Sequence, residues 1–215
     1  MNMKKFLLGD TPLGRFLNCG VNLVILNLLW GICSIPIITI GASTSALYYS
    51  ISAMSRGEEQ MAKTFLKGFK MNFKQSTLLW GLTLFIGFLL LWGIYIVSFW
   101  ENARSVVLML FALPCSLFLM IVSYAFPLLA EFETTIPRLL ANAILLSLGH
   151  FPRSLAIVAV NLLPLILIYI MPSWVVCAVF VWLPIGFALC AYFVYKLLKP
   201  VFAPFRPEEP DLLDM

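Results

Sequence analysis

The chain has 215 residues, of which 62% are hydrophobic and 11% are charged, and its mean hydropathy is +0.99. A water-soluble domain has about 45–50% apolar and about 25% charged residues, so the composition excludes that class. The net charge of +4 rests on few ionisable groups and indicates membrane topology rather than nucleic-acid binding. The sequence therefore predicts an integral membrane protein in contact with the lipid bilayer, without a nucleic-acid partner.

Apolar stretches between charged residues predict about six membrane segments. A helix needs about 20 apolar residues to cross the hydrocarbon layer. The stretches that meet or approach this length are residues 18–35, 37–54, 76–99, 105–130, 154–171 and 174–195. We therefore expect an all-α, polytopic transmembrane helical bundle formed by one domain over residues 1–200. The proline-rich, acidic residues 201–215 predict an extended cytoplasmic tail.

The first two segments are expected to form a hairpin that breaks at Pro36. Proline has no backbone N–H to donate, and Gly41 shortly after it readily adopts turn conformations. With two full crossings and both termini in the cytoplasm, Arg104 is the one basic residue outside, in agreement with the positive-inside rule. A re-entrant hairpin gives the same distribution of charge. The sequence favours a hairpin over a single crossing and leaves both hairpin forms open.

Small residues recur every four positions along the second leg of this hairpin, at Ala42, Ala46 and Ser50. Small side chains at this spacing let helix backbones approach closely in lipid. We expect this face to pack against another helix or against a partner protein.

The apolar stretches also contain uncharged polar side chains. Asn18 and Asn22 lie one turn apart on one helix face, and Thr39 and Asn161 lie in other segments. These four residues are candidates for a polar path through the membrane. The alternative, which we favour for the amides, is hydrogen bonding to neighbouring helices.

Residues 56–75 combine basic and aromatic side chains at helical spacing. Lys63, Lys67, Lys70 and Lys74 alternate with phenylalanines, a pattern typical of an amphipathic helix that lies at the membrane interface. A second such helix is expected within residues 131–153, whose apolar face is too short to cross. Lipid anchoring is the favoured interpretation of the lysines, and contact with a partner is the alternative.

The predicted membrane segments contain no Asp, Glu, Lys, Arg or His. This argues against an ion-coupled transporter and an intramembrane protease, both of which use ionisable groups within the membrane. No metal-ligand spacing or nucleotide-binding motif is present, so neither a catalytic site nor a cofactor is predicted. The remaining candidates for an enzyme acting on lipid-like substrates are Glu131, Glu133 and His150 at the inner surface.

Aromatic residues account for 14% of the chain, and four of them, Trp80, Trp100, Trp174 and Tyr195, lie near predicted segment ends, as in membrane aromatic belts. Trp30, Trp92 and Trp182 lie closer to the segment interiors. They are the first candidates for stacking against a sugar if a cavity exists.

The order of several motifs resembles the YesL family of bacterial integral membrane proteins, whose function is unknown. The motifs in the first hairpin are Asn27-Leu28-Leu29-Trp30, Cys33-Ser34-Ile35-Pro36-Ile37, Thr39 with Gly41-Ala42, and Ala46-Leu47-Tyr48-Tyr49. Further matches are Phe65, Phe69-Lys70-x-Asn72-Phe73-Lys74-Gln75, Phe126-Pro127-Leu128, Asn142-Ala143 and His150-Phe151-Pro152. The likeness covers roughly residues 10–200.

The resemblance implies a small multi-pass protein of the cell membrane of Gram-positive bacteria, often encoded near carbohydrate importers of the ATP-binding-cassette (ABC) type. It carries over no catalytic residue. The implied role is accessory, with the permease subunits of such a sugar importer, or a second copy of the chain, as partner.

Three functions are therefore considered. The first is a non-enzymatic accessory or regulatory component of carbohydrate (oligosaccharide) uptake that contacts a partner through the Ala42 face or the lysine helix. The second is an uncoupled small-molecule or sugar permease, which predicts a wet cavity between the Asn18 and Asn22 face, the second hairpin leg and the last two segments. The third is the enzyme that uses Glu131, Glu133 and His150.

Overall fold

The computed structural model describes residues 12–99, 104–170 and 182–205, and within these ranges all regular secondary structure is helical. The α-helices are α2 (Pro12–Cys33), α3 (Ile40–Ser55), α4 (Met61–Ser98), α5 (Arg104–Glu131), α6 (Ile136–Gly149), α7 (Phe151–Ile170) and α9 (Phe187–Phe202). Short 3₁₀ turns η1 (Ile37–Thr39) and η4 (Ala203–Phe205) and the π-turn η3 (Trp182–Gly186) complete the described elements. The predicted all-α fold is confirmed.

Four described helical stretches are long and apolar enough to cross a membrane: Leu13–Cys33, Met61–Val97, Met109–Glu131 and Pro184–Phe205. Helices α6 and α7 meet at a bend of 106° and qualify only as a pair, which allows up to five spans in the described part of the chain. Helix α3 has 16 residues and is not among them. At 1.5 Å per residue it extends about 24 Å, short of a hydrocarbon layer of about 30 Å. The protein is a multi-pass membrane protein in which the second hairpin leg is too short to cross as one straight helix.

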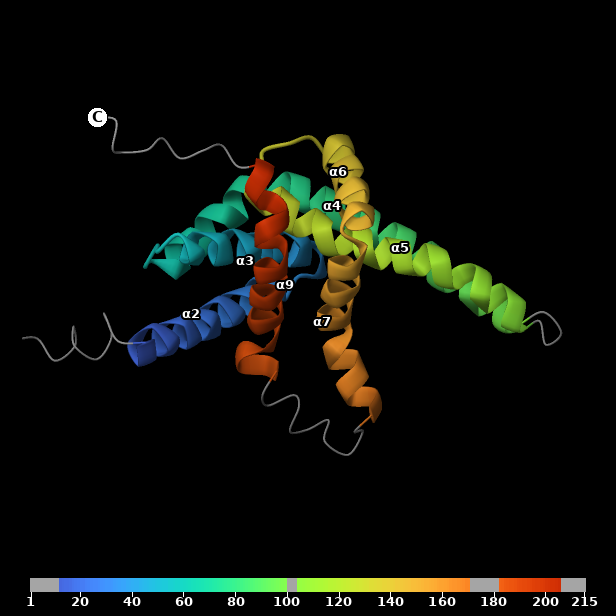
Figure 1. The fold of residues 1–215 in the computed structure, drawn as a ribbon, viewed down its shortest axis with the longest axis horizontal. Helices are drawn as coiled ribbons and strands as arrows, with labels where there is room; N and C mark the ends of the chain where they lie inside the picture. The colour runs from blue at the N-terminus through green and yellow to red at the C-terminus, as the bar shows by residue number, and fades with distance from the viewer. Residues whose placement is uncertain (1–11, 100–103, 171–181, 206–215) are drawn as a thin grey trace, which may run out of the picture.

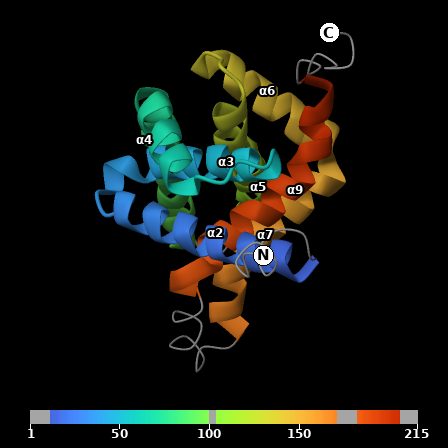
Figure 2. The same cartoon turned by 90° about the vertical axis from the view of Figure 1, so that its left-hand side faces the viewer.

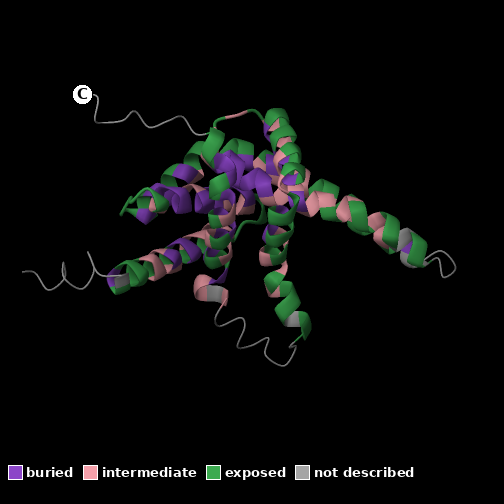
Figure 3. Cartoon of the chain, in the orientation of Figure 1, coloured by how far each residue is buried: buried purple, intermediate pink, exposed green. Residues whose placement is uncertain are grey.

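The helices spread outward from a shared centre. In Figure 1, α4 and α5 extend together to one side, α2 extends to the other, and α7 and α9 run side by side below. Figure 2 shows the same centre from the side, where α3 lies among α2, α4, α5 and α9. Buried residues gather at this centre, whereas the outer turns of α5 and α7 are exposed (Figure 3). Those exposed turns are apolar, as expected of surfaces that face lipid.

Helix α3 forms the middle of the core, and 11 of its 16 residues are buried. Ala42, Ala46 and Ser50 are each 0% exposed. This face therefore packs against helices of the same chain, and its burial is incompatible with the alternative that it docks a partner. Part of the polarity of α3 is satisfied within the helix: the hydroxyls of Ser43 and Ser50 donate to backbone carbonyls four residues earlier, at 3.0 and 2.8 Å.

Helices α3 and α4 approach each other more closely than larger side chains would allow. A Cβ atom at Gly41 would lie 2.5 Å from the carbonyl oxygen of Ser76 and 2.5 Å from the Cβ of Trp80. At the other end of the pair, a Cβ at Gly68 would lie 2.7 Å from the ring of Tyr49. The Trp80 indole N–H also donates to the carbonyl of Ile37 at 2.8 Å, which fastens the hairpin turn to α4.

The predicted interfacial helix over residues 56–75 is not a separate element. It forms the first part of α4, which is continuous over 38 residues. The expected boundary at residue 76 is absent because residues 72–77 contain no proline or glycine, and the buried side chains of Met61 and Phe65 pack into the same core. At 1.5 Å per residue α4 extends about 57 Å, nearly twice the hydrocarbon thickness.

Other predicted boundaries also differ from the structure. Helix α2 begins at Pro12 rather than at residue 18, and α9 continues to Phe202 rather than ending at residue 195. The first part of the expected tail is therefore helical up to Phe205. The second expected amphipathic helix corresponds to α6. Residues 174–181 of the last predicted segment lie outside the described residues.

The close approach at Gly41 predicts a position-specific effect on stability. Replacing Gly41 with Ala should lower the free energy of unfolding by about 1–3 kcal/mol, because the new methyl group meets the backbone of α4. Gly81→Ala is the matched control, since nothing lies within 4 Å of its Cβ position. That variant should unfold at the same or a higher temperature. Equal unfolding midpoints for both variants in detergent micelles would contradict the packing.

Candidate functional site

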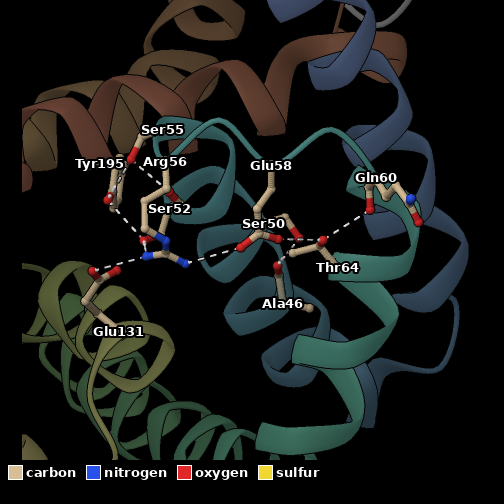
Figure 4. A network of polar contacts seen from close by, with 10 residues as sticks. All are labelled: Ala46, Ser50, Ser52, Ser55, Arg56, Glu58, Gln60, Thr64, Glu131 and Tyr195. Atoms are coloured by element: carbon tan, nitrogen blue, oxygen red, sulfur yellow. Dashed lines mark hydrogen bonds and ion pairs between the residues drawn. The ribbon is translucent and has the colours of Figure 1, made fainter. Parts of the chain in front are cut away.

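A polar network surrounds the C-terminal end of α3 (Figure 4). The Arg56 guanidinium donates to the hydroxyl of Ser52 at 2.8 Å. It also lies 3.9 Å from a carboxylate oxygen of Glu131 and 3.9 Å from one of Glu58. The Glu131 side chain is only 7% exposed, so its negative charge is held inside the protein beside this cation.

Helices α9 and α4 also join the network. The Tyr195 hydroxyl of α9 donates to Ser52 at 3.1 Å and lies 3.3 Å from the Ser55 hydroxyl. The Thr64 hydroxyl of α4 lies 3.1 Å from the carboxylate of Glu58. Gly57 has a φ angle of +88°, a conformation that favours glycine, and lets the chain turn from α3 towards α4. The network thus fixes the ends of α3 and α5 against α9 and the start of α4.

This arrangement predicts unequal effects of removing its two charges. Arg56→Gln should destabilise the protein by about 1–3 kcal/mol because it leaves a nearly buried carboxylate without its cation. The Arg56→Gln, Glu131→Gln double variant should be more stable than Arg56→Gln alone. Chemical unfolding in micelles gives the free energy of unfolding of the wild-type chain, both single variants and the double variant. Additive losses of this free energy from the two substitutions would contradict an interaction between Arg56 and Glu131.

A pocket of about 560 Å³ lies beside this network, between α2, the end of α3 and α9. It brings Asn18 and Asn22 together with residues at least 170 positions later in the chain. Its lining comprises Arg15, Asn18, Cys19, Asn22, Met54, Ser55, Gly57, Glu58, Tyr192, Tyr195, Lys196 and Lys199. The pocket corresponds to part of the cavity that the permease hypothesis predicts.

The other two candidates for the polar path lie elsewhere. The Thr39 hydroxyl is within 2.6 Å of the carbonyl of Cys33 and 2.7 Å of that of Pro36, where it holds the hairpin turn. The Asn161 amide donates to the Ser123 hydroxyl at 2.9 Å and links α7 to α5. The structure therefore brings together two of the four predicted path residues and gives the other two local bonding roles.

Asn27 has a role that the sequence did not reveal. Its side-chain oxygen accepts the backbone N–H of Ala188 at 2.8 Å, and the residue is 2% exposed. Ala188 lies in the first turn of α9, directly after the π-turn, where a backbone N–H needs a partner outside the regular helix. A buried amide in an apolar segment was the available signal, but its partner is 161 positions away.

The four lysines of the basic stretch lie on an exposed face of α4. Lys63, Lys67, Lys70 and Lys74 are all classed as exposed, and we refer to them as the lysine face. A groove of about 720 Å³ runs beside Lys70 and Lys74 and is completed by Phe132, Glu133 and Thr134 after α5. Because α3 packs on another side of α4, the lysine face is open.

The proposed catalytic trio is dispersed. Glu131 is paired with Arg56, Glu133 lines the groove by the lysine face, and His150 caps the end of α6 with its Nδ1 3.4 Å from the carbonyl of Leu146. In the described part of the chain, no hydrogen bond, ion pair or pocket joins all three side chains. Among the described residues no group of three or more His, Cys, Asp or Glu could hold a metal ion.

The three candidate tryptophans do not share a sugar-binding cavity. The Trp30 indole N–H donates to the Thr44 hydroxyl at 3.2 Å. The centre of the Trp30 ring lies 4.3 Å from that of the Phe187 ring, with the two planes tilted by 30°. Trp92 lies in an exposed row of aromatic rings on the outer part of α4, and Trp182 lies in the π-turn. None of them lines either pocket described above.

Comparison with known proteins adds a partial match. Residues 23–94 match the family model described as "Protein of unknown function, DUF624", which covers one third of the chain. No curated protein matches. No solved structure matches. The matched region contains the second half of α2, all of α3 and all of the lysine face, and over this region the chain is similar to a family of proteins of unknown function.

Proposed function

We propose that this chain is a non-enzymatic accessory or regulatory membrane subunit that contacts a partner protein involved in carbohydrate uptake. The observation that supports this proposal is the exposed lysine face on a helix that also contains a membrane-crossing stretch. Of the two contact surfaces expected from the sequence, this one is open and the Ala42 face is buried.

The length of α4 supports a position of the lysine face outside the hydrocarbon layer. The uncharged residues 76–98 are sufficient to cross, since about 20 residues are needed. The preceding residues 61–75 then extend about 22 Å beyond the membrane. The lysine spacings of four, three and four residues keep the four cations in one stripe on this extension. A stripe of this kind is accessible to a protein and not only to lipid headgroups.

The chemistry of the lysine face indicates a partner with an acidic surface. Complementary charges steer such an encounter and fix its register. The groove beside Lys70 and Lys74 also exposes rings of Phe69, Phe73 and Phe132, which offer apolar contact area next to the charges. The carbohydrate setting rests on the resemblance to the YesL family, and the permease subunits of an ABC sugar importer are the partners it implies.

A second candidate function is the uncoupled sugar permease, which the pocket at Asn18 and Asn22 favours. This function requires the pocket to continue between α2 and α9 to the other side of the membrane. Uptake of labelled oligosaccharide into liposomes containing the protein tests it. Uptake that Asn22→Leu blocks would favour the permease over the accessory role.

The accessory role predicts that partner recovery depends on the lysine face. Changing Lys63, Lys67, Lys70 and Lys74 to Gln should lower the amount of partner co-purified in mild detergent by about tenfold, because several charge contacts of up to about 1 kcal/mol each are lost. The control is the Lys196→Gln, Lys199→Gln variant, which removes cations from another surface. Mass spectrometry of the purified complexes gives the stoichiometry.

Each result of this experiment has a defined meaning. Importer permease subunits recovered with the wild-type chain and lost with the four-lysine variant would support the whole proposal. Another acidic membrane protein with the same dependence would overturn the carbohydrate setting. Recovery of the chain alone, or equal recovery with both variants, would overturn the proposed contact.

A further inference from the structure

We infer that the pocket between α2, the end of α3 and α9 is a binding site for a phosphate ester anion. The pocket has a volume of about 560 Å³, and its lining holds three cations, Arg15, Lys196 and Lys199. The proposed accessory role does not use this pocket, and the inference does not depend on the lysine face.

The charge balance of the pocket favours an anion. Its one lining carboxylate, Glu58, already lies 3.9 Å from Arg56 and 3.1 Å from the hydroxyl of Thr64. The three lining cations therefore exceed the one negative charge, which has partners outside the cavity. An anion that enters the pocket meets cations from two of its walls, Arg15 of α2 and Lys196 and Lys199 of α9.

The types of side chain present suit phosphate oxygens. Arginine offers a planar fork of N–H donors, and lysine offers a compact ammonium, the two groups that most often hold phosphate in proteins. The amides of Asn18 and Asn22 add neutral polar groups on the α2 side. Monoanionic or dianionic phosphate can accept several such bonds at once, whereas a neutral sugar would leave the three charges uncompensated.

The wall formed by α9 is held in place by contacts already described. The Tyr195 hydroxyl donates to Ser52 at 3.1 Å, so the network around Arg56 anchors this side of the pocket. On the same wall, the Lys196 ammonium lies 5.5 Å from the centre of the ring of Tyr192, one helical turn earlier, in a cation–π contact. A cavity whose walls are anchored in this way loses little freedom when a ligand enters.

Two sources can supply a phosphate ester at this position. Helices α2 and α9 both contain membrane-crossing stretches, and the pocket lies where their basic residues are, as expected at the level of lipid headgroups. An anionic phospholipid is one source, and a soluble sugar phosphate is the other. Both present the same phosphate chemistry to Arg15, Lys196 and Lys199.

The test measures ligand binding by the full chain in nanodiscs. In one arm, native mass spectrometry compares retention of phosphatidylglycerol with retention of phosphatidylcholine. In the other arm, titration calorimetry with glucose 6-phosphate uses nanodiscs made only of phosphatidylcholine. The Arg15→Gln, Lys196→Gln, Lys199→Gln variant should bind about a hundredfold more weakly, since each cation near a phosphate contributes about fivefold.

The matched control neutralises the same number of cations at Lys63, Lys67 and Lys70, outside the pocket. Selective retention of phosphatidylglycerol that only the pocket variant loses supports the site with lipid as its source. Binding of glucose 6-phosphate with the same dependence supports it with a soluble source. Binding in neither arm, or equal loss in both variants, overturns the inference. If the triple variant does not fold, the single variant Lys199→Gln, near the end of α9, replaces it. This single variant should bind the ligand about fivefold more weakly than the wild-type chain does.

Discussion

The close contact between α3 and α4 is the constraint on which the rest of the structure depends. It needs glycine at position 41, where the backbone of α4 leaves no room for a side chain, glycine at position 68, which the ring of Tyr49 covers, and small residues along α3. Helix α3 is rich in serine, and hydroxyls of this kind suit a helix surrounded by protein better than one surrounded by lipid. Intrahelical hydrogen bonds from Ser43 and Ser50 satisfy part of this polarity without water. The Ala42, Ala46 and Ser50 face of α3 therefore serves as a packing core rather than as a surface for recognition.

The position of α3 also determines where the polar surfaces form. Its C-terminal end carries Arg56 to the buried carboxylate of Glu131, and the same end forms one wall of the cationic pocket. Before its opposite end, the carbonyl of Ile37 in the hairpin turn accepts a hydrogen bond from the Trp80 indole N–H. Two basic surfaces result, the lysine face on α4 and the pocket between α2 and α9. They belong to different helices, so variants can remove the charges of one and keep those of the other.

The sequence predicts the features of this protein that depend on local pattern. Composition predicts an all-α membrane protein, and the spacing of Ala42, Ala46 and Ser50 predicts a close helix contact. The continuity of α4 was missed because residues 72–77 are too polar for a clear span but contain no helix breaker. The pocket and the bond between Asn27 and Ala188 join residues more than 150 positions apart. Contacts of that kind depend on how the helices pack, which the pattern within each segment does not specify.

The burial of α3 is tested most directly by the reactivity of a thiol placed within it. In a background whose five native cysteines are alanines, Ser50→Cys is a nearly isosteric probe at a site that is 0% exposed, and Met71→Cys is an exposed reference on the part of α4 that precedes the membrane-crossing stretch. N-ethylmaleimide reacts with the thiolate, so labelling reports access of the thiol from water. We predict that the Ser50→Cys variant reacts about a hundredfold more slowly than the reference while folded and at the same rate once unfolded. Equal rates in the folded protein would contradict the central position of α3.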